Sequence, residues 1–290
     1  MRGLWVAMAT PLDAEGKVDH ELLATHGLRL LDKGCDGLVP FGTTGEGPSF
    51  SAGERLAAVE ALLRAGVPST RIGLGTGYPA IPDTVALTRD ALSLGLTHAL
   101  ILPPYFFRDA DDAGIEDAFA AIIDGVGSDR LRATLYHIPQ VSGVAVPPAV
   151  FGRLRSRYGA LVAGVKDSSG DFAQFRAFRE AAPDAATLVG AEADIARALA
   201  EDGAGTICAM VNIVPRLVRA MFDGLAAEPD MRAAIALMAG PFQATLKSVL
   251  AAQTGEAAWR AVRAPLREVD PGVGTRIAAR LAALGTAKAA

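Results

Sequence analysis

The sequence has little cysteine and histidine, and neither residue is arranged to hold a metal. Its two cysteines, Cys35 and Cys208, lie far apart without C-x-x-C or Cys/His spacing, which argues against a disulfide framework and a zinc motif. The four histidines form no pair at the spacing of metal ligands. We therefore expect two buried thiols and no metal site.

Long apolar runs and blocks of like charge are also missing. No stretch approaches the roughly 18 consecutive apolar residues of a membrane helix, although 51% of the residues are hydrophobic. The apolar run in residues 1–12 is too short for a signal peptide. A net charge of -4 without a basic stripe argues against nucleic acid or an anionic membrane as a partner. We expect a soluble, cytoplasmic protein that binds a small neutral or acidic metabolite.

What the sequence contains instead is a repeated alternation of short apolar runs and helix-length segments. Continuous apolar runs are typical of parallel strands that helices cover on both sides. Asp19 is placed to begin the first helix, and Ser51 with Glu54 forms a capping box for the second. The candidate strands are residues 4–9, 36–41, 71–74, 98–102, 131–136, 161–166, 187–189 and 206–208.

Eight strand and helix units in about 225 residues fit either an open doubly wound sheet or a closed barrel. The count of eight favours an α/β fold of the (β/α)8 TIM barrel type. From residue 212 onward the pattern is helical and punctuated by prolines. We predict a catalytic barrel in residues 1–225 and a C-terminal helical segment in residues 226–290 that packs on the barrel.

Lysine is scarce, since only five of the 28 Lys and Arg residues are lysine. Lys166 follows the apolar run 161–165, where burial disfavours the charged form of a lysine. A neutral amine can attack a ketone, which a guanidinium cannot do. The spacing alone also fits a lysine that pairs with Asp167 or reaches solvent. Lys166 is therefore a candidate nucleophile.

Other polar residues follow the predicted strands at the end where a barrel carries its active site. Thr43 and Thr44 lie in a glycine-rich turn that can approach a carboxylate with its N–H groups. Tyr136 is either a core aromatic residue or a general acid and base. His137 is the only histidine that we expect to face the site.

The segment after the seventh strand adds two candidates for substrate binding, Gly190 and Glu192. The carboxylate of Glu192 is able to accept hydrogen bonds from substrate hydroxyls. Ordinary loop polarity explains the same residues, so this alternative stays open.

Taken together, these segments resemble the dihydrodipicolinate synthase and N-acetylneuraminate lyase family of pyruvate-dependent class I aldolases. The resemblance covers nearly the whole chain. It depends on four motifs: Phe41-Gly-Thr-Thr-Gly-Glu46, Leu102-Pro-Pro-Tyr105, Tyr136-His-Ile-Pro139 with Ser142-Gly143, and Gly164-Val-Lys-Asp-Ser-Ser-Gly170.

The resemblance implies a role for each of the central residues. Lys166 would form a Schiff base with pyruvate or another small 2-oxo acid, and Tyr136 would carry protons. Thr43 and Thr44 would bind the carboxylate and relay protons, with Thr44 taken as catalytic. The family also implies a homotetramer built as a dimer of dimers, with no metal or organic cofactor.

Two departures from the family pattern bear on the reaction. Phe106 stands where the synthases commonly have a second tyrosine that reaches the neighbouring subunit's site, and Val141 stands where they carry an arginine. Our main hypothesis is a lyase or aldolase that cleaves or forms a C–C bond between pyruvate and an aldehyde. The alternatives are a 2-oxo-3-deoxy sugar acid dehydratase, a 4-hydroxy-tetrahydrodipicolinate synthase and a non-catalytic metabolite-binding barrel.

Overall fold

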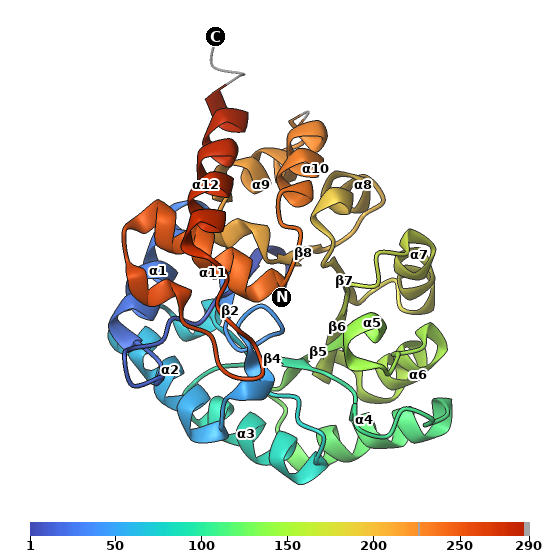
Figure 1. The fold of residues 1–290 in the computed structure, drawn as a ribbon. Helices are drawn as coiled ribbons and strands as arrows, with labels where there is room; N and C mark the ends of the chain where they lie inside the picture. Colours follow the sequence, from blue (N-terminus) through green and yellow to red (C-terminus); the bar gives the residue numbers. More distant parts are fainter. Residues whose placement is uncertain (226, 287–290) are drawn as a thin grey trace.

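The fold is a barrel of parallel strands surrounded by helices (Figure 1). The computed structural model describes residues 1–225 and 227–286. The sheet order within these residues is β2-β1-β8-β7-β6-β5-β4-β3, and each pair of neighbours in this order is parallel. The predicted (β/α)8 class is confirmed. The strands are β1 Gly3–Ala7, β2 Gly37–Val39, β3 Gly73–Gly75, β4 His98–Ile101, β5 Arg132–His137, β6 Val162–Asp167, β7 Ala186–Val189 and β8 Gly205–Cys208.

The barrel closes between β2 and β3, the two ends of the sheet order. One isolated parallel bridge joins Leu38 to Ile72 there. The buried guanidinium of Arg55 adds a link across the same seam, donating to the carbonyls of Gly75 at 2.9 Å and Gly47 at 2.5 Å. Side-chain hydrogen bonds therefore supplement a short main-chain ladder at this seam.

Helices connect the strands and cover the outside of the barrel (Figure 1). The predicted caps are confirmed, because the Asp19 side chain accepts from the N–H of Leu22 at 2.9 Å, and Ser51 with Glu54 forms the capping box. The helices between strands are α1 His20–Asp32, α2 Ala52–Arg64, α3 Ile81–Ser93, α4 Asp112–Val126, α5 Pro139–Ser142, α6 Pro148–Tyr158, α7 Phe172–Ala181 and α8 Ile195–Ala200.

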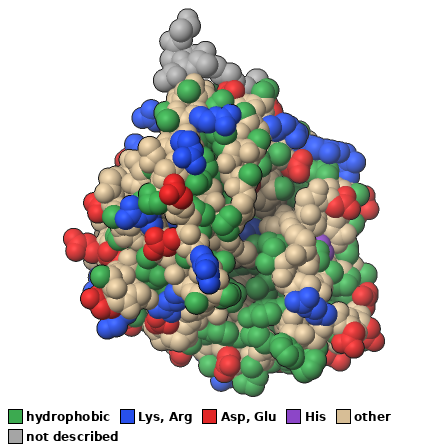
Figure 2. Space-filling model, in the orientation of Figure 1, with side chains coloured by type: hydrophobic (Ala, Val, Ile, Leu, Met, Phe, Trp, Pro, Cys, Tyr) green, Lys and Arg blue, Asp and Glu red, His purple; other side chains and the backbone are tan. Residues whose placement is uncertain are grey.

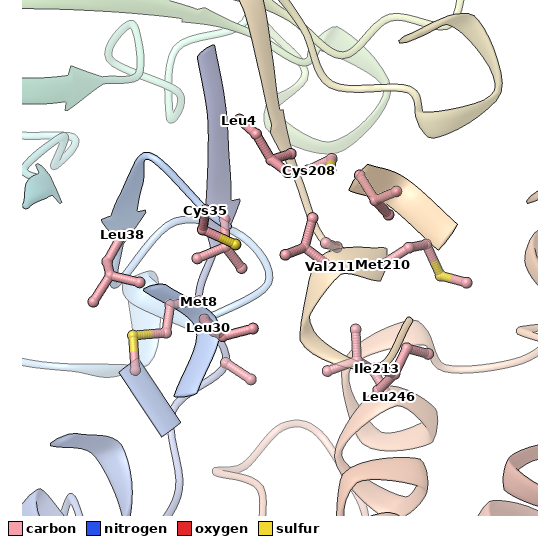
Figure 3. Packing of buried hydrophobic residues seen from close by; sticks show 14 of the residues in the cluster. Leu4, Met8, Leu30, Cys35, Leu38, Cys208, Met210, Val211, Ile213 and Leu246 are labelled. Carbon is pink, nitrogen blue, oxygen red and sulfur yellow. The ribbon is translucent and has the colours of Figure 1, made fainter. Parts of the chain in front are cut away.

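Apolar side chains fill the barrel and the layer between strands and helices. The interior holds a small cluster that includes Trp5, Leu100 and Tyr136. A larger cluster lies outside the strands and includes both free cysteines, Cys35 and Cys208, which are buried as predicted. Figure 3 shows these thiols among leucine, methionine and other apolar side chains. Their burial raises the pKa of Cys35 to about 12.

Further helices follow β8, and α11 packs against α12. The predicted division between barrel and C-terminal segment at residue 225 stays a prediction, and residues 226 and 287–290 lie outside the described residues. Within the described chain, no helix has the length and apolar character needed to cross a membrane. The helices are α9 Pro215–Phe222, α10 Glu228–Ala236, α11 Phe242–Thr254 and α12 Pro271–Thr286.

Candidate active site

Lys166 lies on β6 and is buried in the barrel interior, with 4% of its surface exposed. Strand register places it beside Tyr136 on β5 and Leu188 on β7. Its Nζ lies 4.3 Å from the centroid of the Tyr136 ring. Among the described residues no carboxylate forms an ion pair with this amine, and the Asp167 carboxylate instead accepts from the N–H of Ser169 at 2.9 Å. The amine therefore lies in an apolar and aromatic environment.

The phenol of Tyr136 connects Lys166 to the turn after β2. Its hydroxyl lies 3.3 Å from Oγ1 of Thr43, and either oxygen can donate in this hydrogen bond. Thr44, the next residue along the chain, is buried. The hydroxyl that bonds the phenol belongs to Thr43. The amine, the phenol and the Thr43 hydroxyl, together the polar row, thus lie next to one another in the structure.

The turn that carries Thr43 has an unusual backbone. Phe41 and Glu46, which flank it, have φ angles of 57° and 56°, in the left-handed region that side chains rarely adopt. Gly45 sits so close to the segment that follows β1 that an added Cβ would lie 2.6 Å from the carbonyl oxygen of Met8. The turn is therefore held in a strained conformation, which persists only where its surroundings fix it.

A small cavity of about 20 Å³ borders this row. Thr43, Tyr136 and Leu100 line it together with Arg55. The cavity has room for about one water molecule. Figure 2 shows the molecular surface hollowed near the centre of the face over which α11 lies, and this is the face on which a barrel of this class carries its site.

His137 does not join the row. Adjacent residues of a strand point to opposite sides, so its ring lies outside the barrel, 5.3 Å from the Phe178 ring of α7. Its Nδ1 accepts from the N–H of Val146 at 3.0 Å. Burial lowers the pKa of His137 and raises that of Asp167, its neighbour across the β5/β6 pair. This position gives no support to a contact between His137 and substrate.

The two candidates after β7 make contacts within the protein. Gly190 donates its N–H to the carbonyl of Asp167 at 2.6 Å, and an added Cβ would lie 1.9 Å from Oγ of Ser168. Glu192 accepts from the N–H groups of residues 209 and 210 at 2.8 and 2.9 Å. Both residues shape the loops at this end of the barrel, and their contact with substrate stays a prediction.

The sequence profile of the dihydrodipicolinate synthetase family matches residues 1–277. The chain belongs to this family. As a member of the dihydrodipicolinate synthetase family it is a lyase, which agrees with the main hypothesis drawn from the motifs.

Similar proteins support the family assignment along the whole chain. An uncharacterised DapA-like lyase of Chloroflexus aurantiacus is 38% identical over 234 residues, covering 80% of this chain and 78% of the relative. The crystal structure of dihydrodipicolinate synthase from Agrobacterium tumefaciens has a TM-score of 0.92 at 33% identity, covering 98% of this chain and 99% of that one. YagE of Escherichia coli, solved in complex with pyruvate, shares the fold with a TM-score of 0.87 at 23% identity, covering 98% and 99%.

Sequence reasoning missed the residues of α11 that bond the turn carrying Thr43. Lys247 on α11 forms a buried ion pair with Glu46, and Gln243 on the same helix donates to the Thr43 carbonyl at 3.4 Å. The scarcity of lysine would have flagged Lys247 as readily as Lys166. Its helical context, however, gave no reason to connect it with a turn about 200 residues earlier.

Proposed function

We propose that the protein is a pyruvate-dependent class I aldolase that forms a Schiff base on Lys166. The observation that carries the proposal is a buried amine without a carboxylate partner among the described residues, beside a phenol that is hydrogen-bonded to Thr43. Such an amine is not held as one half of an ion pair, so it is available to attack a carbonyl carbon.

The chemistry begins with attack of the Lys166 amine on C2 of the oxo acid, and loss of one water gives an iminium. The iminium withdraws electrons from C3, so the C3–C4 bond of a 4-hydroxy-2-oxo acid breaks and leaves an enamine. The hydroxyl proton departs through Tyr136 and Thr43 as the aldehyde forms. Protonation of the enamine at C3 and addition of water then release pyruvate and the free amine. These steps require no metal or organic cofactor.

Pyruvate fits the proposal as the 2-oxo acid. YagE, which shares the fold, was solved in complex with pyruvate. The turn of Thr43 and Thr44 supplies backbone N–H groups and hydroxyls, which are suitable partners for a carboxylate next to the reacting carbonyl. We propose Thr43 as the relay partner of Tyr136, and Thr44 as a second residue that binds the carboxylate.

Borohydride reduction in the presence of pyruvate tests the Schiff base. Intact mass should show one adduct, and peptide mapping should place it on Lys166. Lys166→Arg should fold and trap nothing, because a guanidinium does not form the imine. Lys33→Arg, a change at a surface lysine paired with Asp32, is the matched control and should trap as the native chain does. A missing adduct, or one on another lysine, contradicts the proposal.

Cleavage of a 4-hydroxy-2-oxo acid is the direction that we propose. Phe106 and Val141 are exposed and offer neither the phenol nor the guanidinium of the biosynthetic synthases. Incubation with 2-oxo-3-deoxy sugar acids should release pyruvate and an aldehyde. A dioxo or semialdehyde product from the same acids would indicate a dehydratase, and rapid consumption of aspartate semialdehyde would indicate the synthase. No turnover and no adduct would indicate the non-catalytic barrel.

We also propose that the protein acts in the cytoplasm as a homotetramer. Phe106 and Phe107, in the loop after β4, are 75% and 72% exposed, and their rings lie 5.3 Å apart. Adjacent exposed phenyl rings are uncommon on monomers and typical of subunit contacts.

A further inference from the structure

Helix α11, in the C-terminal region, reaches the turn that carries Thr43 through a buried ion pair. Lys247 Nζ lies 2.7 Å from Oε1 of Glu46, and both side chains are wholly inaccessible to solvent. The other carboxylate oxygen of Glu46 accepts from the main-chain N–H of Arg263 at 3.0 Å. The carboxylate therefore joins the turn to two separate parts of the C-terminal region.

A second contact of α11 reaches the same turn. Gln243 lies one helical turn before Lys247, so both side chains project from one face of the helix. Its Nε2 donates to the main-chain carbonyl of Thr43 at 3.4 Å. One face of α11 thus contacts both the residue that bonds the Tyr136 phenol and the left-handed residue at the end of the turn.

Burying a charged pair costs free energy, because both groups lose their contact with water. Desolvation lowers the pKa of Lys247, and the attraction of Glu46 opposes that shift. Apolar residues of similar volume often stabilise a fold as well as a buried ion pair does. What such residues cannot supply is a directed bond that holds Glu46 in its left-handed conformation.

We propose that the Glu46-Lys247 pair is a positioning element that sets the Thr43 hydroxyl against the Tyr136 phenol and so controls proton transfer during the reaction. The inference rests on the function proposed above. Neither side chain needs to touch substrate, because the pair acts through the backbone of the turn. Helix α11 is then required for proton transfer at Tyr136.

Exchange of the pyruvate methyl hydrogens for deuterium, followed by NMR, tests this role without any aldehyde. Exchange needs both the imine and a proton carrier, whereas borohydride trapping needs only the imine. Lys247→Met and Glu46→Gln should each lower the exchange rate at least tenfold at saturating pyruvate, while trapping at Lys166 stays within about threefold of the native level. If the pair only stabilised the fold, its loss would lower exchange and trapping together. A loss of exchange alone therefore indicates a positioning role.

Val249→Ala provides the control, since Val249 is a buried apolar residue on the same helix. It should lower the melting temperature and leave the exchange rate per folded molecule unchanged. Native-like exchange in a folded Lys247→Met or Glu46→Gln variant overturns the inference. If Lys247→Met does not fold, Glu46→Gln decides, because its amide has the size of the carboxylate. If the native chain itself traps no pyruvate, the proposed Schiff-base function fails. This result differs from native-like exchange in the variants, which overturns the positioning role alone.

Discussion

The phenol of Tyr136 lies between the two other members of the polar row. Its ring faces the Lys166 amine, 4.3 Å from the ring centroid, and its hydroxyl is hydrogen-bonded to Thr43. A positioned general acid and base typically contributes about 10²–10⁴-fold to the rate. We propose that the phenol oxygen of Tyr136 makes this contribution.

Tyr136→Phe should therefore lower kcat for aldol cleavage by about 10²–10⁴-fold, while borohydride still traps pyruvate on Lys166. Steady-state kinetics and intact mass on the same preparation measure the two effects. Tyr158→Phe removes a phenol that bonds Asp124 on the surface, at 2.9 Å, and should leave kcat unchanged. Near-native turnover in Tyr136→Phe would exclude the phenol as the proton carrier.

Lys166 is a candidate because it follows an apolar run, and the proton-carrying role of Tyr136 comes from the family resemblance. Strand register in the structure places the two residues side by side. The family resemblance implies Thr44 as the catalytic threonine, whereas the hydroxyl that bonds the phenol belongs to Thr43. A turn does not impose a two-residue period, so the sequence does not show which of two adjacent threonines faces the phenol. The placement of His137 was foreseeable: next to an inward Tyr136, strand alternation points its ring outward. The Glu46-Lys247 pair was not foreseeable, because no local pattern relates residues so far apart.

At the scale of elements, α1 is tied to the segment after β8 by His26. Its Nε2 lies 3.0 Å from Oδ1 of Asn212, and its Nδ1 lies 3.1 Å from the guanidinium of Arg29. Because Arg29 only donates, Nδ1 accepts and the ring is neutral with its proton on Nε2. Asn212 further bonds the carbonyl of Ala7 and the N–H of Ala9, which makes it a structural residue in this fold.

Acidification should loosen this junction. Burial lowers the pKa of His26 from 6.5 to about 3, so the unfolded chain binds the extra proton first. The stability from neutral His26 is complete above about pH 6.5 and is lost as the pH falls toward 3. Between about pH 7.5 and pH 5 the loss amounts to about 2 kcal/mol.

Urea denaturation of the native chain and of His26→Gln at both pH values measures that loss. Glutamine still offers Asn212 an N–H and cannot take up a proton. The variant should start less stable but lose about 2 kcal/mol less than the native chain on acidification. Equal losses in both proteins would show that His26 is not the group that titrates.

The elements themselves were largely predictable. Each predicted strand lies within a few residues of an observed one, since parallel strands need continuous apolar runs. Helix α3 begins at Ile81, with Pro82 and Asp83 in its first turn, where a proline removes no helical hydrogen bond. The first residue of a helix depends on local capping, which several nearby residues can supply. The position of a strand is set more firmly by the burial of its apolar residues.

For the whole molecule, the exposed phenyl rings after β4 set an expectation for assembly. Phe107→Asp should place a charge in a subunit contact and convert the proposed tetramer to a smaller species. Light scattering coupled to size exclusion measures the mass against 29.9 kDa for one chain. Leu28→Asp, at an apolar residue of α1 that is 41% exposed, is the control and should leave the mass unchanged. A native chain that elutes as a monomer contradicts the proposed tetramer.

Barrel closure was predicted from the number of strands, and no residue pattern located the seam between β2 and β3. Arg55 lies at one end of this seam. At the other end, Arg71, which precedes β3, donates to the main-chain carbonyls of Cys35 and Asp36, which precede β2. The remaining strand pairs are specified by main-chain groups, which every sequence possesses. Here two arginines add side-chain hydrogen bonds to the short main-chain ladder, so part of the closure of this barrel is encoded in side chains. A single substitution at Arg55 can therefore weaken this closure beside the turn that carries Thr43, whereas no single side chain has that effect on a strand pair joined by main-chain groups alone.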